Sequence, residues 1–267
     1  MYIAERVTRE SLYVLEQQLT PKHRYIIEIL SVVRAATGKQ LERLHFSTPN
    51  RATRIRMCNY TLKRMTDLKV LVREREPSGG LGGGSDPYYY ALDRPGQVIA
   101  WPDKTSRGKY WQDPYPDPTY LRHRLGITEV FVAANEAIKD GFVLRTYQPE
   151  PQCWRHLPME LRRRVRPDAY LALSDGQRLH HWFIEVDMGS EWPKRINEKL
   201  NTYYRYYQSG YEQHDLKGVF PLVLWLVPDR KRQGQIQALI DRHPQPAQRL
   251  FRVELQAEAY QVLTKMS

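Results

Sequence analysis

The first hundred residues contain three short runs in which apolar positions recur at helical spacing. Thr20-Pro21 is a helix-start signal, and the apolar residues of 25–33 follow at intervals of three and four, with a predicted end at Gly38. A short second helix is predicted over 41–46, and a proline-containing start signal at 47–49 opens a third. The pattern therefore predicts three consecutive helices.

The third of these helices is predicted to have one apolar side and one polar side. Its apolar positions are Ile55, Cys58, Leu62, Met65 and Leu68. The positions nearly opposite are Thr53, Arg56, Tyr60 and Lys63, with Arg51 and Arg54 near the start. Such a helix buries one side in a core and offers a basic and aromatic side to a partner.

Two strand-like pieces follow the third helix. Residues 70–73 and 87–93 are rich in β-branched and aromatic residues, and the glycine-rich stretch 77–86 between them predicts a turn. Three helices and a hairpin are the outline of a winged helix-turn-helix, which we assign to 20–100. Residues 1–19 are left as an N-terminal segment, and the proline-rich, aperiodic 101–118 are expected to be a linker.

The second half of the chain alternates helical and strand patterns. A predicted helix at 119–141 is followed by strands at 169–173 and 179–187, a helix at 190–210, an apolar strand at 219–229, a helix at 230–243 and a strand at 250–255. This order predicts an α/β sandwich over 119–267, so we expect an α/β protein overall (α+β when both domains are counted).

Charge is concentrated in the predicted DNA-binding region. The chain has 41 Lys and Arg against 30 Asp and Glu, a net charge of +11. Between Lys22 and Arg75 there are 13 basic and 4 acidic residues, a local net charge of +9. Such a patch favours a polyanionic partner, so we expect double-stranded DNA to bind the polar side of the third helix together with Arg73 and Arg75. The alternative is a solvated basic face on a helical bundle.

Several classes of protein are not favoured. No apolar run approaches the roughly 18 residues of a membrane-spanning helix, and the N-terminus has no apolar signal core, so we expect a cytoplasmic protein without membrane contact. The two cysteines, Cys58 and Cys153, lack the spacing of a zinc site.

Three acids are expected to meet at one edge of the second domain. Side chains alternate along a strand, so Glu185 and Asp187 share a face. Asp168 opens the preceding strand, and the turn at 174–176 predicts that the two strands pair. Carboxylates crowded in this way repel each other unless Mg²⁺ or Mn²⁺, or neighbouring cations, compensate them. Arg195 and Lys199, four residues apart on the next predicted helix, are the candidate cations.

The stretch "RPDAYLAL…HHWFIEVDMGSE…KRINEKLNTYYRYYQSG" resembles the signature of the replication-relaxation family of plasmids and other mobile elements. The resemblance implies an N-terminal winged helix and a C-terminal domain similar to the PD-(D/E)xK restriction-endonuclease fold. It implies that Asp168 and Glu185 are metal ligands, while Asp187 stands where active nucleases usually have a lysine. Lys199 or Arg195 would then take over the role of the lysine, and Glu129 or Glu136 could complete the metal site.

Three interpretations of the acids remain open. In the first, Asp168, Glu185 and Asp187 hold Mg²⁺ or Mn²⁺ and, with Lys199 and Arg195, hydrolyse DNA. In the second, the protein binds DNA in the replication, mobilisation or regulation of a mobile element, and its nuclease-like domain contacts a second copy or a replication or transfer protein. In the third, the acids and the basic helix form a salt-bridge network.

Overall fold

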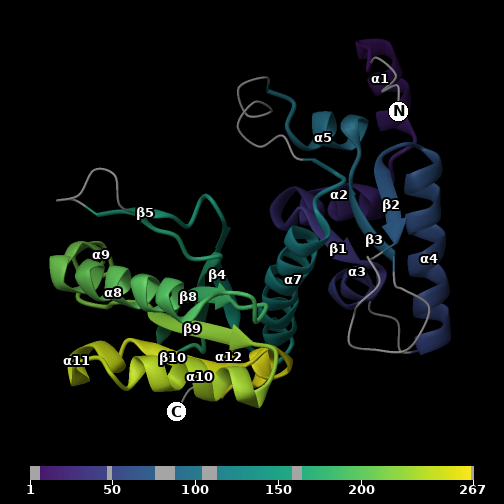
Figure 1. The fold of residues 1–267 in the computed structure, drawn as a ribbon. Coiled ribbons are helices and arrows are strands. Elements are labelled where there is room, and N and C mark those ends of the chain that lie inside the picture. The colour runs from purple at the N-terminus through teal and green to yellow at the C-terminus, as the bar shows by residue number, and fades with distance from the viewer. Residues whose placement is uncertain (1–6, 47–49, 76–87, 104–112, 158–163, 266–267) are drawn as a thin grey trace. The chain divides into compact units, whose positions relative to one another are not determined.

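The computed structural model describes residues 7–46, 50–75, 88–103, 113–157 and 164–265 (Figure 1). The chain forms an α/β fold, as predicted, in two compact units. The N-terminal unit comprises Met1–Val132 and the C-terminal unit comprises Ala133–Ser267. The division falls within helix α7 (Pro118–Ile138). In the described ranges, no helix combines the length and apolar character needed to cross a membrane.

The N-terminal unit contains the predicted helices and hairpin. Its helices are α1 (Arg9–Gln17), α2 (Pro21–Val33), α3 (Gly38–His45), α4 (Arg51–Asp67), α5 (Arg94–Ala100) and the first part of α7. Its strands β1 (Ala35–Thr37), β2 (Leu71–Arg75) and β3 (Tyr88–Leu92) form an antiparallel sheet in the order β1-β3-β2. β2 and β3 are the predicted pair of strands, whereas the predicted turn at 77–86 lies outside the described residues.

The junction between the first two predicted helices differs from the expectation. α2 ends at Val33, and Gly38 begins α3 instead of ending the first helix. The intervening residues are taken up by β1, which pairs with β3. The Thr37 hydroxyl accepts a hydrogen bond from the Gln40 amide at 3.2 Å and caps α3. Long-range pairing and a local cap thus override a continuous helical pattern.

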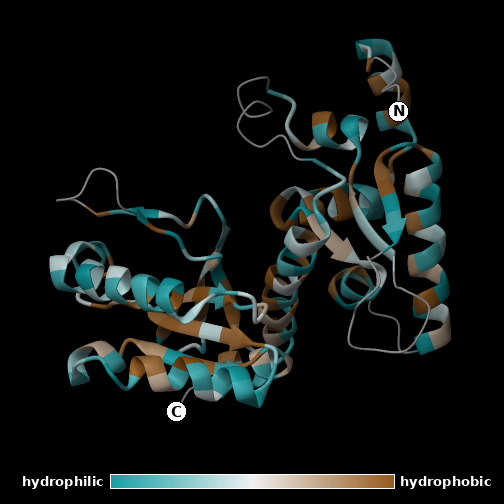
Figure 2. Ribbon diagram, viewed as in Figure 1, coloured by the Kyte–Doolittle hydropathy of each residue, from teal (hydrophilic) through white to brown (hydrophobic). Residues whose placement is uncertain are grey.

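The core of this unit joins α2, α3, α4 and the hairpin. Ile26, Leu30, Leu41, Leu62 and Met65 are fully buried in it. α4 contributes apolar residues from successive turns on one of its sides. Figure 2 shows them as brown segments along a helix that is otherwise largely hydrophilic. Burying a side chain of this size stabilises the fold by about 1.5–3 kcal/mol, so this face fixes how α4 is oriented.

The C-terminal unit is built on a five-stranded sheet in the order β10-β9-β8-β7-β4. Its strands are β4 (Val143–Pro149), β7 (Ala169–Ser174), β8 (Leu179–Val186), β9 (Leu222–Val227) and β10 (Phe251–Leu255). β4, β7 and β8 pair antiparallel, whereas β8, β9 and β10 pair parallel. β5 (Arg155–His156) and β6 (Arg164–Val165) form a separate small pair.

Helices α8 (Pro193–Ser209) and α10 (Arg230–Ile240) pack on the same face of this sheet. Residues of both helices join one buried cluster with alternate residues of the strands, among them Phe183 and Trp225. α9 (Tyr211–Asp215), α11 (Gln245–Gln248), the 3₁₀ helix η1 (Gln256–Glu258) and α12 (Ala259–Thr264) complete the unit. Gly210, with φ of 73°, ends α8 as the sequence predicted.

Candidate functional site

Helix α4 presents an exposed polar side opposite its buried side. Asn50 caps the helix by accepting the Thr53 amide at 3.0 Å. Cys58, Leu62 and Met65 are at most 2% exposed, so they hold the opposite side in solvent. Of the residues predicted for that side, Arg56, Tyr60 and Lys63 are exposed and Thr53 is partly exposed. Tyr60 is 74% exposed, which is unusual for so large an aromatic side chain.

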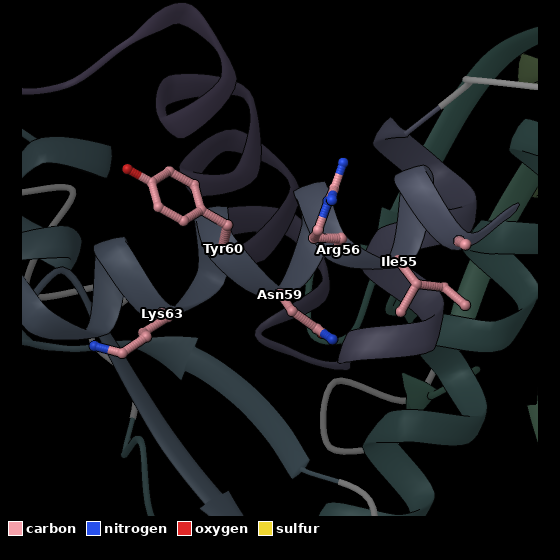
Figure 3. A pocket seen from close by; sticks show the side chains of 6 residues that line it. Ile55, Arg56, Asn59, Tyr60 and Lys63 are labelled. Carbon is pink, nitrogen blue, oxygen red and sulfur yellow. The ribbon is translucent and has the colours of Figure 1, made fainter. Parts of the chain in front are cut away.

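Several side chains on this exposed side are available to bind a partner. Within the described part of the chain, Arg56 and Tyr60 have no hydrogen-bond or ion-pair partner. Lys63 has one exposed partner, Asp67, at 2.8 Å. Figure 3 shows Arg56, Tyr60 and Lys63 projecting from the helix. Exposed donors of this kind can reach phosphate oxygens or base edges.

The two arginines at the start of α4 differ. Arg51 is exposed, whereas Arg54 donates to the Glu42 carboxylate of α3 at 2.7 Å and is only partly exposed. The ion pair ties α3 to α4, so part of the charge of Arg54 serves the packing of the two helices.

The hairpin carries two exposed arginines beside a tyrosine. The guanidinium of Arg73 lies 3.6 Å from the centre of the Tyr88 ring, and that of Arg75 lies 5.9 Å from it. A hydrogen bond from Arg75 and the charges of both arginines lower the pKa of Tyr88. Stacking of this kind orients a guanidinium while leaving its donors accessible.

In the C-terminal unit, the structure places Asp168 beside the end of β8, as predicted. Asp168 comes directly before β7, and its amide donates to the Ile184 carbonyl at 2.8 Å. Its Oδ2 accepts a hydrogen bond from the Val186 amide at 2.6 Å. The side chain is largely buried, so this carboxylate joins the start of β7 to the end of β8.

Glu185 is held by two residues of α8. Only 2% of its surface is exposed; Lys199 Nζ lies 2.9 Å from its Oε2, and the Tyr203 hydroxyl donates to its Oε1 at 2.6 Å. Burial raises the pKa of Glu185, the charge of Lys199 opposes this, and Asp168 raises it further. Burial lowers the pKa of Lys199, but Glu185, Asp168 and Glu191 outweigh it, so the net shift is upward. Of the three predicted acids, Glu185 is thus the one that the structure places in an ion pair with Lys199.

Asp187 has a partner that the sequence did not indicate. Its Oδ2 accepts from Arg232 Nε at 2.7 Å and its Oδ1 from Nη2 at 2.9 Å, while the Gly189 amide adds a bond at 3.0 Å. Arg232, on α10, was missed because "DRKRQG" offers three adjacent cations and no pattern selects one. Arg195 was wrongly expected beside the acids: it pairs with Glu191 at 3.3 Å and is 72% exposed.

Tyr206 of α8 is buried, with 4% of its surface exposed. Its hydroxyl donates to Glu212 at 2.6 Å, and Arg155 binds the same carboxylate at 3.1 Å. This buried polar group lies apart from the acids and was not foreseen.

The acids, as arranged, do not fit a magnesium ion. Mg²⁺ takes six oxygen ligands in near-octahedral geometry. Both oxygens of Glu185 and of Asp187 already accept hydrogen bonds from protein donors. Across the described ranges, no group of three His, Cys, Asp or Glu side chains is placed to hold a metal. Glu129 is engaged in the N-terminal unit, where it binds Arg43 and accepts from Gln40.

The fold and these two groups of side chains define a two-unit α/β protein with an exposed basic helix and a buried acidic centre. The replication-relaxation family model matches residues 27–223, which is 197 of the 267 residues, and the chain belongs to this family. Searches of curated proteins and of solved structures found no match.

Proposed function

We propose that the protein binds double-stranded DNA through α4 and the β2–β3 hairpin, and that this binding serves the replication or mobilisation of a plasmid or other mobile element. Membership of the replication-relaxation family supports the second part. In this proposal residues 20–100 act as a winged helix-turn-helix. α3 and α4 would be its helix pair, and the hairpin would be its wing.

The observation that carries the proposal is the exposed side of α4. Arg56, Tyr60 and Lys63 project from it, and the buried residues opposite hold it in place. The major groove is about 12 Å wide and admits an α-helix. Arg51 and Thr53 would lie at the end of α4 that enters first, and Arg73 and Arg75 would follow the backbone beside it. Arg54 would contribute its charge while remaining paired with Glu42.

The C-terminal unit would serve protein contact rather than chemistry. Its three acids are compensated by Lys199, Arg232 and backbone amides, as a structural network requires. A homodimer, or a complex with a replication or transfer protein, would then place two DNA-binding units on one site. The unit would then have a restriction-endonuclease-like fold, built on the mixed sheet β10-β9-β8-β7-β4.

A second candidate is a divalent-metal-dependent DNA endonuclease. One observation favours it: Lys199 Nζ, on α8, lies 2.9 Å from the Glu185 carboxylate. Lys199 could therefore act as the lysine that the nuclease motif usually has at the position of Asp187. Arg195 pairs with Glu191 instead, so Asp168, Glu185 and Lys199 would be its catalytic residues, and a metal would have to displace the donors that now hold Glu185. Supercoiled DNA incubated with Mg²⁺ or Mn²⁺ tests this candidate. Cleavage by the wild type that is lost in Asp168→Ala would establish it, and intact DNA under both metals would rule it out.

The test of DNA binding compares two double variants with the same loss of charge. Arg56→Ala/Lys63→Ala removes two cations from α4, and Lys139→Ala/Arg178→Ala removes two exposed cations from the C-terminal unit. In fluorescence anisotropy with a duplex probe, the first variant should bind at least about tenfold more weakly. The slope of log K against log [salt] should also become shallower by up to about 2, because each lost phosphate contact removes about 0.9 from it. The second should bind like the wild type. Equal affinities for both variants would refute the proposal.

A further inference from the structure

The exposed side of α4 is interrupted by a shallow apolar hollow. The hollow is lined by Ala52, Ile55, Arg56, Asn59, Tyr60 and Lys63. These residues follow one another at intervals of three and four or are direct neighbours, so they form one stripe along the helix. Figure 3 shows Asn59 between Arg56 and Lys63, with Ile55 nearer the start of α4. An apolar floor is unexpected on a surface whose other contacts would be with phosphates.

Asn59 is the polar group that borders this floor. It is exposed, and its side-chain amide has no hydrogen-bond partner within the described residues. An asparagine amide carries a donor and an acceptor side by side. It therefore matches the N6 donor and N7 acceptor that adenine presents in the major groove, and no other base presents the same pair.

The floor of the hollow has a matching partner on the same base pair. Thymine carries a C5-methyl group in the major groove, and small or aliphatic side chains are the contacts that recognise it. Ala52 and Ile55 supply such a surface about two turns and one turn before Asn59. Arg56 and Lys63 flank the hollow with positive charge, as contacts to the phosphates on either side require.

We infer that this hollow reads an A·T base pair, with Asn59 hydrogen-bonded to the adenine and Ala52 and Ile55 in contact with the thymine methyl group. The inference rests on the proposed DNA binding and adds sequence selectivity to it. Charge favours DNA over a protein partner, because the region from Lys22 to Arg75 carries a net charge of +9. The hollow also lacks the extended apolar area of a protein-docking groove.

The test begins with duplexes selected from a randomised library by the full-length wild-type protein. In the selected duplex, each A·T pair is replaced in turn by G·C, and separately each thymine is replaced by deoxyuridine, which lacks only the methyl group. One A·T pair should lower affinity by about tenfold or more when changed to G·C. Deoxyuridine at the same pair should lower it by about fourfold, the equivalent of one lost methyl contact.

Two variants assign these effects to the hollow. Asn59→Ala should lose most of the discrimination between A·T and G·C at that position, keeping only the roughly fourfold effect of the methyl contact, while keeping its affinity for random DNA. Ile55→Ala should discriminate less between thymine and deoxyuridine than the wild type does. The deoxyuridine comparison with the wild type requires no change in the protein, so a folding defect cannot imitate it. Unchanged A·T preference in Asn59→Ala, or no effect of deoxyuridine at any position, would overturn the inference. If Arg56→Ala/Lys63→Ala still weakens binding in that case, the proposed function stands and only the selectivity is lost.

Discussion

Replacing Arg232 with methionine should destabilise the C-terminal unit severely. Arg232 donates two hydrogen bonds to Asp187, at 2.7 and 2.9 Å, and a third to the Glu191 carbonyl at 2.8 Å. The side chains of Arg232 and Asp187 are 10% and 1% exposed. Methionine keeps much of the aliphatic volume of arginine and removes the charge and the donors.

The magnitude follows from what the variant leaves behind. Asp187 would remain an almost fully buried carboxylate with only the Gly189 amide as a described partner. Breaking a buried ion pair by removing one partner costs about 3–5 kcal/mol, because the remaining charge is uncompensated. The double variant Arg232→Met/Asp187→Leu removes both charges and should recover most of this loss. The same substitution at Arg195, which is 72% exposed and pairs with Glu191 just before α8, should cost about 0.5 kcal/mol or less.

Urea unfolding followed by tryptophan fluorescence measures these differences, since Trp182 and Trp225 are buried in the C-terminal unit. A loss below about 1 kcal/mol in Arg232→Met, or one equal to that of Arg195→Met, would refute the reasoning. Mg²⁺ provides a further check. If Asp187 were a metal ligand, millimolar Mg²⁺ would restore the stability of Arg232→Met, and we expect it not to.

Two further predictions concern other buried groups. The pKa of Glu185 is raised to about 7, so between about pH 4.5 and pH 7 the folded protein binds more protons than the unfolded chain, and the free energy of unfolding should fall as pH rises through that range. The slope should reach at most about 1.4 kcal/mol per pH unit and should be smaller in Glu185→Gln, as urea unfolding at a series of pH values would show; an unchanged slope would contradict the assignment. In the N-terminal unit, a Cβ atom on Gly96 would lie 2.3 Å from the Val70 carbonyl oxygen, so Gly96→Ala should lower stability by about 1–3 kcal/mol in thermal unfolding. Gly234→Ala, where a Cβ meets nothing within 4 Å, is the matched control.

Much of the fold was predictable because local patterns and tertiary packing agree. The periodicity of α4, the hairpin of β7 and β8 and the stop of α8 at Gly210 all follow from residues close together in the chain. β1 and β4 were missed for the opposite reason. β1 has three residues and exists because it pairs with β3, and β4 pairs with β7 across a register shift. Such short or irregular strands have no periodicity of their own.

In the candidate sites too, local sequence patterns were predictable and long-range contacts were not. Arg56, Tyr60 and Lys63 could be placed on one side of α4 because helical spacing alone decides it. Lys199 could be placed near Glu185 because the helix follows the strand directly. Arg232 lies 45 residues beyond Asp187, and only the parallel pairing of β8 and β9 brings α10 to the end of β8. Asn59 was overlooked because a single exposed amide is inconspicuous until the apolar hollow beside it is seen.

The position of the unit division within α7 limits how this protein can be divided or recombined. Leu121 and Leu125 pack with Ala35 and Tyr89, and the Thr128 hydroxyl donates to the Ala35 carbonyl at 2.7 Å. A fragment that stops at residue 100 would therefore expose apolar surface and leave a buried carbonyl without its donor. An N-terminal unit exchanged between relatives, in the laboratory or by natural recombination, would keep these contacts only if it carried α7 through Val132 with it.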